Sequence, residues 1–235
     1  MEYFAGINLS FFNFGGHLLD YGSGDGLVSV FFIKKGFYVT SVDIDYDSKN
    51  KILSQLTEEE KSRFNFILLK EKDSLNNYSH KFDYIICREV LEHIKDYRFV
   101  IELFNDLLNK NGLCVISVPT YFTEKLFSFL DPKWFEKCEH VNVFKKKDII
   151  NLAKSNKFNL EKITNHSFNR TLFWALVVPF RPKHDMGRIL NKNKLIKFLE
   201  YFSYGVCSFK IIDKIGNYVA PKSRVFYLRQ SKNEL

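Results

Sequence analysis

Cysteine is scarce in this sequence, and its few positions exclude two kinds of architecture. The chain of 235 residues has four cysteines and no CxxC pair. Cys87 and Cys114 fall inside apparent core strands, so we expect reduced thiols in a cytoplasmic protein rather than a disulfide framework. Cys138 and His140 could act as two metal ligands, but no second pair follows at zinc spacing, and we therefore expect no metal site.

Long apolar runs and a secretory leader are missing as well. The longest apolar candidate, residues 171–180, falls short of the roughly 18–20 uncharged residues that a membrane-spanning helix needs. No basic segment followed by an apolar stretch and a small-residue cleavage site opens the chain, so we expect no secretory signal. Hydrophobic residues make up 46% and charged residues 26% of the sequence, which favours an ordinary globular domain over a disordered chain.

Negative charge is the minority sign, and the formal net charge is +8. An excess of this kind can indicate an anionic partner such as nucleic acid, a phospholipid or a phosphorylated metabolite. The lysines are spread along the chain, however, and only residues 145–147 form a tight run, so solvated faces explain most of the charge. Nucleic acid and peripheral contact with a membrane stay open as partners, and nucleic acid is not favoured.

Apolar segments of strand length alternate with segments of helical periodicity along most of the chain. Strands are predicted at residues 17–21, 37–42, 64–69, 82–87, 113–118, 158–164 and 224–228. Helices are predicted at 27–35, 48–56 and 147–156, and between a candidate N-cap at Asp96 and a stop at Asn111-Gly112. This alternation predicts an α/β fold, a Rossmann-like and mostly parallel seven-stranded sheet with helices on both faces.

Two connections are longer than this fold requires. They cover residues 120–144 and about 165–223, and the second, with a predicted helix around 190–202, separates the last two strands. Loops of this length in a compact domain usually cover or bind something. We therefore expect a single domain over residues 1–235, with no domain before it and a helical substrate-cap insertion at about 165–223.

A glycine-rich loop, Gly22-Ser23-Gly24-Asp25-Gly26, joins the first predicted strand to the first helix. Glycines permit a tight turn and close approach of a ligand, and the helix N-terminus beyond them favours a negative group. Leu27 stands where the dinucleotide fingerprint has its third glycine, and Asp25 would come close to a pyrophosphate. A ligand with a carboxylate and an ammonium, such as the methionine end of S-adenosylmethionine, suits this loop better.

Asp43 ends the next predicted strand. A carboxylate there can accept hydrogen bonds from both ribose hydroxyls, as the acid about 20 residues onward does in nucleotide-binding folds. Ile44 could then lie against the adenine face. The alternative is a plain glycine turn followed by a solvated aspartate.

Four stretches carry a resemblance to a known family: LLDYGSGDG at 18–26, VTSVDID at 39–45, FDYIICREVLEHI at 82–94 and GLCVISVP at 112–119. Together they resemble the class I S-adenosylmethionine-dependent methyltransferases, particularly the small-molecule branch that includes the quinone-biosynthesis methyltransferases. The resemblance covers about residues 16–164 and leaves the insertion at 165–223 uncovered. It implies S-adenosylmethionine as the cofactor.

The resemblance also implies roles for individual cofactor-binding residues. The expected methionine-side contacts are Asp20, Gly22, Ser23 and Gly24, with Asp43 as the ribose ligand, Ile44 as the adenine contact and Arg88 turning its backbone toward the sulfonium. An acid near the adenine amino group would be Asp73, with Glu71 as the alternative.

Two histidines are candidates for catalysis. Methyl transfer depends mainly on in-line placement of the nucleophile, and a general base helps when the acceptor is a hydroxyl. His140 precedes the helix before the sixth strand, a region that contacts substrate in the family, and is a candidate base or substrate contact; a structural histidine is the alternative. His93 is the second candidate, for which a histidine that fixes the loop by hydrogen bonds is the favoured alternative.

The methyl acceptor is left open by the sequence. Residues 87–90 lack the Asn/Asp-Pro-Pro-aromatic run and the Pro-Cys pair of nucleobase methyltransferases, so we favour O- or N-methylation of a small metabolite or a lipid-linked sugar or quinone. RNA ribose methylation and a cofactor-binding module without activity are the alternatives. Aromatic residues in the two long connections would line an apolar acceptor pocket, touch a lipid surface, or form the core of a small cap or dimer contact.

Overall fold

The computed structural model describes residues 3–70, 75, 78, 81–178 and 194–231, and a seven-stranded sheet organises them. The strand order is β5-β4-β3-β6-β7-β9-β8. The strands are β3 (His17–Tyr21), β4 (Tyr38–Asp43), β5 (Phe64–Leu68), β6 (Phe82–Arg88), β7 (Leu108–Pro119), β8 (Phe158–His166) and β9 (Ser223–Gln230). From β5 to β7 all neighbours are parallel, and β9 is antiparallel to both β7 and β8. The predicted mostly parallel sheet is therefore confirmed.

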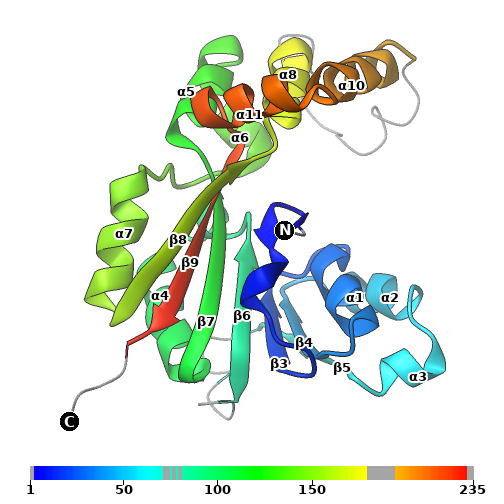
Figure 1. The fold of residues 1–235 in the computed structure, drawn as a ribbon, viewed down its shortest axis with the longest axis vertical. Coiled ribbons are helices and arrows are strands. Elements are labelled where there is room, and N and C mark those ends of the chain that lie inside the picture. Colours follow the sequence, from blue (N-terminus) through cyan, green and yellow to red (C-terminus); the bar gives the residue numbers. More distant parts are fainter. Residues whose placement is uncertain (1–2, 71–74, 76–77, 79–80, 179–193, 232–235) are drawn as a thin grey trace.

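Helices cover both faces of this sheet because successive strand residues point to opposite sides. Leu18 packs in the cluster that α1 (Leu27–Lys34) and α2 (Asp47–Leu53) close, whereas Leu19 packs in the cluster closed by α4 (Tyr97–Leu107) and α7 (Lys146–Ser155). Figure 1 shows these helix pairs on opposite sides of the sheet. The smaller elements are α3 (Glu58–Lys61), the hairpin β1 (Tyr3–Phe4) and β2 (Ile7–Asn8), and the 3-10 turns η1 (Leu9–Phe11) and η3 (Leu91–His93).

The end of α4 differs from the sequence prediction. The helix ends at Leu107, and Leu108 already lies in β7, where it pairs with Phe82. Leu108 is fully buried, and a buried leucine satisfies the apolar pattern of a helix face and of a core strand equally well. The predicted stop at Asn111 marks instead a left-handed residue, with φ 64°, inside the first part of the strand.

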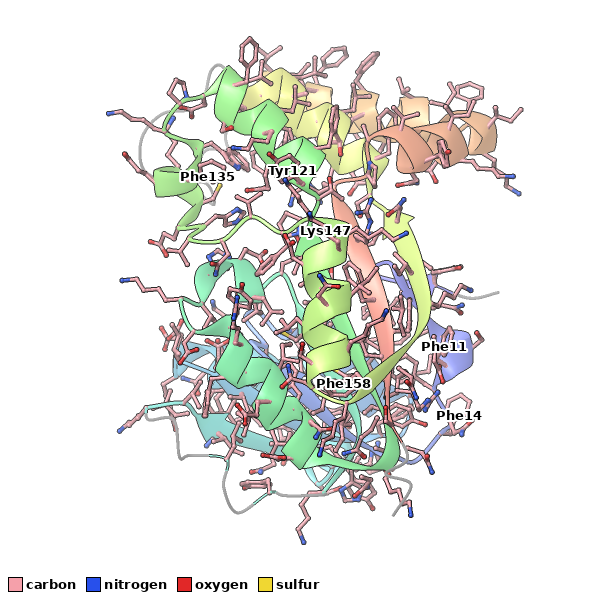
Figure 2. The ribbon with its side chains drawn as sticks, turned by 90° about the vertical axis from the view of Figure 1, so that its left-hand side faces the viewer. Phe11, Phe14, Tyr121, Phe135, Lys147 and Phe158 are labelled. Atoms are coloured by element: carbon pink, nitrogen blue, oxygen red, sulfur yellow. The ribbon has the colours of Figure 1, made fainter. Side chains whose placement is uncertain are left out.

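Within the described residues, five helices form a separate layer at the carboxyl end of β7, which we call the cap. They are α5 (Tyr121–Leu130), α6 (Trp134–Cys138), α8 (Phe168–Val177), α10 (Lys194–Cys207) and α11 (Lys210–Val219). Figure 1 shows the cap above the sheet, and Figure 2 shows Tyr121 and Phe135 within it and Phe158 at the opposite end of the sheet. The described part of the predicted insertion is helical, because α8, α10 and α11 lie between β8 and β9. The helix expected around 190–202 is α10. Residues 190–193 lie outside the described part.

The cap has its own apolar core, which accounts for part of the predicted aromatic groups. Phe127, Trp134 and Phe173 are buried there, whereas Phe122 and Phe129 on α5 remain exposed. The interpretation of these aromatic residues as the core of a small cap is therefore confirmed for the first three side chains.

Among the described helices, none is long and apolar enough to cross a membrane.

Candidate active site

The glycine loop forms the tight turn that its sequence predicts. Gly22 adopts a left-handed φ of 79° and donates its N–H to the carbonyl of Val42 at 2.8 Å. A side chain at Gly22 would collide with Val90, which packs directly against the turn. Gly24 is also left-handed, but a side chain there would project into open space. A side chain is therefore excluded at Gly22 by Val90, whereas the space beside Gly24 is open.

A cavity of about 530 Å³ lies at the carboxyl ends of β3, β4 and β6. This edge of an open parallel sheet is where α/β folds bind ligands, and the volume falls within the range for small-molecule sites. Its walls include Gly22, Gly24, Asp43 and Ile44 on the glycine-loop side, and Glu89, His93, Phe99 and Glu139 opposite them.

Asp43 is held in a fixed orientation on this wall. Its Oδ2 accepts the Gly24 N–H at 2.7 Å, and its Oδ1 accepts the Asp45 N–H at 3.0 Å. Ile44 follows it and is 80% exposed, so its apolar side chain is free to lie against a flat ring. The ribose role of Asp43 and the adenine role of Ile44 stay predictions, and both residues line the cavity.

Asp20 lies beneath the glycine loop rather than on the described cavity wall. Its carboxylate accepts hydrogen bonds from the backbone N–H of Ser29 at 3.0 Å and from the Ser29 hydroxyl at 2.5 Å, so it fixes the first turn of α1. Burial raises the pKa of Asp20 to about 6. Direct contact of Asp20 with the methionine end stays a prediction.

Ser23 and Arg88, two further residues predicted to contact the cofactor, each have a buried polar atom without a hydrogen-bond partner among the described residues. These atoms are the Ser23 hydroxyl oxygen and the Arg88 Nε. A polar ligand group entering beside Gly24 could satisfy the Ser23 hydroxyl, which fits a bound carboxylate. Asp73 and its alternative Glu71 lie outside the described residues.

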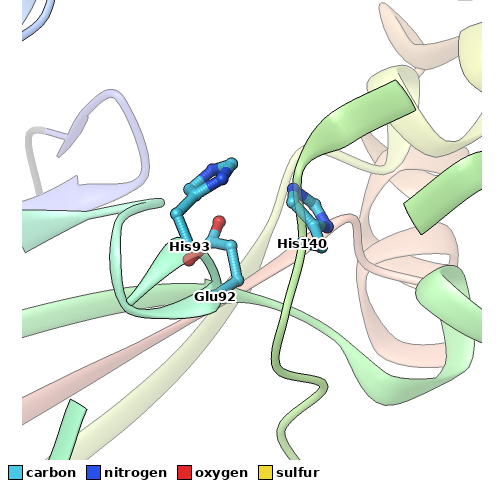
Figure 3. Close-up of side chains that lie close together, drawn as sticks. All are labelled: Glu92, His93 and His140. Atoms are coloured by element: carbon cyan, nitrogen blue, oxygen red, sulfur yellow. The ribbon is translucent and has the colours of Figure 1, made fainter. Parts of the chain in front are cut away.

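The structure brings the two candidate histidines together. Their ring centroids are 4.8 Å apart in an edge-to-face arrangement. The Nδ1 of His140 is 2.7 Å from Oε2 of Glu124, a side chain of α5 that is 1% exposed and also accepts the Trp134 indole N–H. Figure 3 shows His93 rising from the loop after β6 and His140 facing it from the segment before α7. Glu124 was not predicted, because nothing in its local sequence sets it apart from an ordinary helix residue.

Backbone hydrogen bonds join the two histidine loops into one unit. The N–H groups of Val141 and Asn142 both donate to the carbonyl of Glu92. The Asn142 side chain donates to the carbonyl of Ile94 at 2.7 Å, and the Nδ1 of His93 lies 3.1 Å from the carbonyl of Glu139. The loop interpretation of His93 is consistent with this last contact, although His93 also lines the cavity.

Two neighbouring carboxyl groups have pKa values that their environments push apart. Burial raises the pKa of Glu89, but Lys222 and the Ser117 hydroxyl outweigh it and lower that pKa to about 2. Burial, reinforced by the charge of Glu89, raises the pKa of Glu92 well above its ordinary value. Glu89 is therefore ionised near neutral pH, whereas Glu92 holds its proton more tightly than an ordinary glutamate does. Lys222, which enters from the end of the insertion, had no local sequence signal.

The same loops also contain donor atoms of the kind that bind metals. One donor atom each from Glu92, His93 and His140 lies within 4.8 Å of the others. Carboxylate and imidazole are zinc ligands, so the group could hold a divalent ion as well as relay a proton. Cys138, which lies close to His140 along the chain, is not part of this group.

Comparisons with known proteins agree with this geometry. Residues 3–163 match the family described as a methyltransferase domain. A ubiquinone biosynthesis O-methyltransferase from Pelagibacter ubique is 27% identical over 159 residues, covering 65% of this chain and 65% of that protein. One from Coxiella burnetii is 24% identical over 191 residues, covering 78% and 77%. The match thus spans just under two thirds of the Pelagibacter protein.

Among solved structures, a phosphoethanolamine N-methyltransferase 2 from Haemonchus contortus, in complex with phosphomonomethylethanolamine and S-adenosylhomocysteine, superposes with a TM-score of 0.62 at 18% identity. The superposition covers 94% of this chain and 50% of that one, and it shows the shared fold. Because the family match covers most of the chain, the protein belongs to the methyltransferase domain family, and its resemblance to the class I S-adenosylmethionine-dependent methyltransferases is confirmed.

Proposed function

We propose that this protein transfers the methyl group of S-adenosylmethionine to a hydroxyl oxygen of a small, quinone-like acceptor. The observation that carries the proposal is the cavity that has Gly24 and Asp43 on one wall and His93 opposite, with the His140–Glu124 pair beside it. The O-methyltransferase names of the related proteins support oxygen as the nucleophile. RNA ribose methylation is not favoured by these relatives.

The glycine-loop wall holds the cofactor in this proposal. The Asp43 carboxylate accepts the ribose hydroxyls, Ile44 packs on the adenine, and the loop around Ser23 and Gly24 receives the methionine end. S-adenosylmethionine supplies an electrophilic methyl group, so the protein's main task is to align the acceptor oxygen with it.

His140 acts as the general base on the acceptor hydroxyl. Because a carboxylate oxygen accepts hydrogen bonds, the contact with Glu124 places a hydrogen on Nδ1 of the His140 ring. The other nitrogen, Nε2, is then left with a lone pair to take the hydroxyl proton, and Glu124 stabilises the imidazolium that results. Burial, and after it the nearby His140, lower the pKa of His93, so His93 stays neutral and does not compete as a cation.

The test combines binding with product analysis. Purified protein is titrated calorimetrically with S-adenosylmethionine and S-adenosylhomocysteine, and is then incubated with methyl-labelled donor and a catechol, the matching aniline or RNA. We expect micromolar cofactor binding and label on the catechol oxygen. Absence of cofactor binding by folded protein, or label that appears only on nitrogen or on RNA, would contradict the proposal.

A further inference from the structure

Helix α11 presents its apolar face to solvent. Ile211, Ile215 and Tyr218 recur at helical spacing on one face, and they are 74%, 59% and 84% exposed. The inward face is polar or small: the Asn217 side chain accepts the backbone N–H of Phe168 at 2.9 Å, and Gly216 packs against the Phe168 ring. This orientation is the reverse of what a helix on a protein surface in water adopts.

Helix α10 extends the same kind of surface. Leu195, Phe198 and Phe202 are exposed at helical spacing, and the rings of Phe198 and Phe202 stack with centroids 6.5 Å apart. Phe209, between the two helices, is 65% exposed. We call the exposed apolar residues of α10, α11 and their connection the α10–α11 surface; Figure 1 shows α10 projecting from the cap.

Basic side chains accompany this apolar surface. Exposed lysines stand on both helices, at Lys194, Lys197, Lys210 and Lys214. The acidic residues of α10 and α11 are Glu200 and Asp213, and Glu200 is paired with Arg170 at 3.2 Å. The α10–α11 surface is therefore apolar with a positive border.

We propose that the α10–α11 surface binds the surface of an anionic lipid bilayer. Phenylalanine, tyrosine and isoleucine would enter the interface while the lysines lie at the lipid phosphates, which is the pattern of an interfacial amphipathic helix. In a two-fold contact this surface would face itself, and its four exposed lysines would meet only two acidic residues, one of them already paired with Arg170, so the contact lacks charge complementarity. The surface lies outside residues 3–163, so it goes beyond the family and beyond the methyl-transfer proposal.

The test is co-sedimentation of the full chain with vesicles of phosphatidylcholine, alone or with phosphatidylglycerol. We expect binding only when phosphatidylglycerol is present, and a loss of tenfold or more in the triple variant Ile211→Ser, Ile215→Ser, Tyr218→Ser. Lys210→Glu with Lys214→Glu should weaken binding by at least about tenfold, since each basic residue near an anionic surface contributes about 1 kcal/mol. Phe14→Ser, at a 79% exposed phenylalanine outside the cap, is the matched control and should bind normally.

Two readouts keep the result specific. Brominated lipid should quench the fluorescence of the tryptophan introduced by Tyr218→Trp. The thermal unfolding temperature of all variants should stay unchanged, because the substituted residues are exposed. Calorimetric binding of S-adenosylhomocysteine should survive in every variant, which separates this proposal from the methyl-transfer proposal. Wild-type protein that ignores anionic vesicles, binds neutral vesicles equally well, or sediments as a dimer that the triple variant dissociates would overturn it.

Discussion

The carboxyl edge of the sheet and the cap above it use their residues in opposite ways. At the sheet edge, apolar strand residues are buried, and the ligand-facing surface comes from backbone and a few polar groups such as Gly24 and Asp43. In α11 the polar side faces inward, and both α10 and α11 direct large apolar side chains toward solvent. An apolar periodicity therefore indicates the core in the first region and an interaction surface in the second.

The two regions meet at the histidines. His93 belongs to the loop after β6, whereas His140 is held by Glu124 of the cap helix α5. Lys222 adds a second link, because it leaves the insertion and pairs with Glu89 on the cavity wall at 3.2 Å. In the proposed reaction, the cofactor side of the site would come from the sheet edge and part of the acceptor side from the cap.

The largest expected effect tests the division between the cofactor side and the acceptor side. His140→Gln should lower kcat by about 100- to 10,000-fold, the range for loss of a general base, while calorimetric affinity for S-adenosylhomocysteine stays unchanged. Glu124→Gln should lower kcat less, because the ring keeps a hydrogen-bond partner. Equal loss of cofactor affinity and kcat would show that His140 supports the fold instead.

The junction between sheet and cap should be sensitive to acid. Burial lowers the pKa of His166, at the end of β8, to about 4. The unfolded chain takes up this proton near pH 6.5 and the folded chain only near pH 4, so stability falls as pH falls through that window, by up to about 3 kcal/mol. Urea unfolding of wild type and His166→Gln should show their difference changing in this direction between pH 7 and pH 4.

Wild type must be compared with His166→Gln because Asp20 changes the stability with pH in the opposite direction. Its raised pKa, about 6, makes stability fall as pH rises through the range from about 3.8 to 6, and this contribution is common to both. A wild-type-minus-variant difference that is flat with pH would contradict the assignment of a buried neutral His166.

On the sheet edge, Asp43→Ala should weaken S-adenosylhomocysteine binding by roughly 10- to 100-fold, the loss expected for one or two charged hydrogen bonds. Asp25→Ala removes a nearby carboxylate that pairs with Lys51 in solvent, and calorimetry should show little change. Equal affinities of the two variants would remove Asp43 from the cofactor site.

The smallest expected effect separates two glycines of one loop. Gly24→Ala should weaken cofactor binding by about tenfold with a small loss of stability, since its side chain would occupy open space beside the cavity. Gly22→Ala should lower thermal stability more, because its side chain would meet Val90. The reverse ranking, from calorimetry and thermal unfolding together, would place the ligand on the other side of the turn.

Much of the sheet and its cofactor wall could be predicted because the signals are local. The alternation of Leu18 and Leu19 between two faces, the turn at Gly22 and the place of Asp43 at a strand end each depend on a few neighbouring residues. The end of α4 could not be predicted, because Leu108 fits both a helix face and a buried strand. The roles of Glu124 and Lys222 were equally hidden, since a glutamate or lysine in isolation reads as a solvated side chain.

The fold class, the glycine loop and the family could be predicted from the sequence, because the signals for each lie in residues that are close together along the chain. Three features became visible only in the folded protein: β9 lies between β7 and β8, Glu124 contacts His140 beside His93, and α10 and α11 direct apolar side chains outward. The physical reason is that burial and pairing are properties of neighbours in space. A periodic pattern predicts which residues share a face, but only packing shows whether that face contacts the core or solvent.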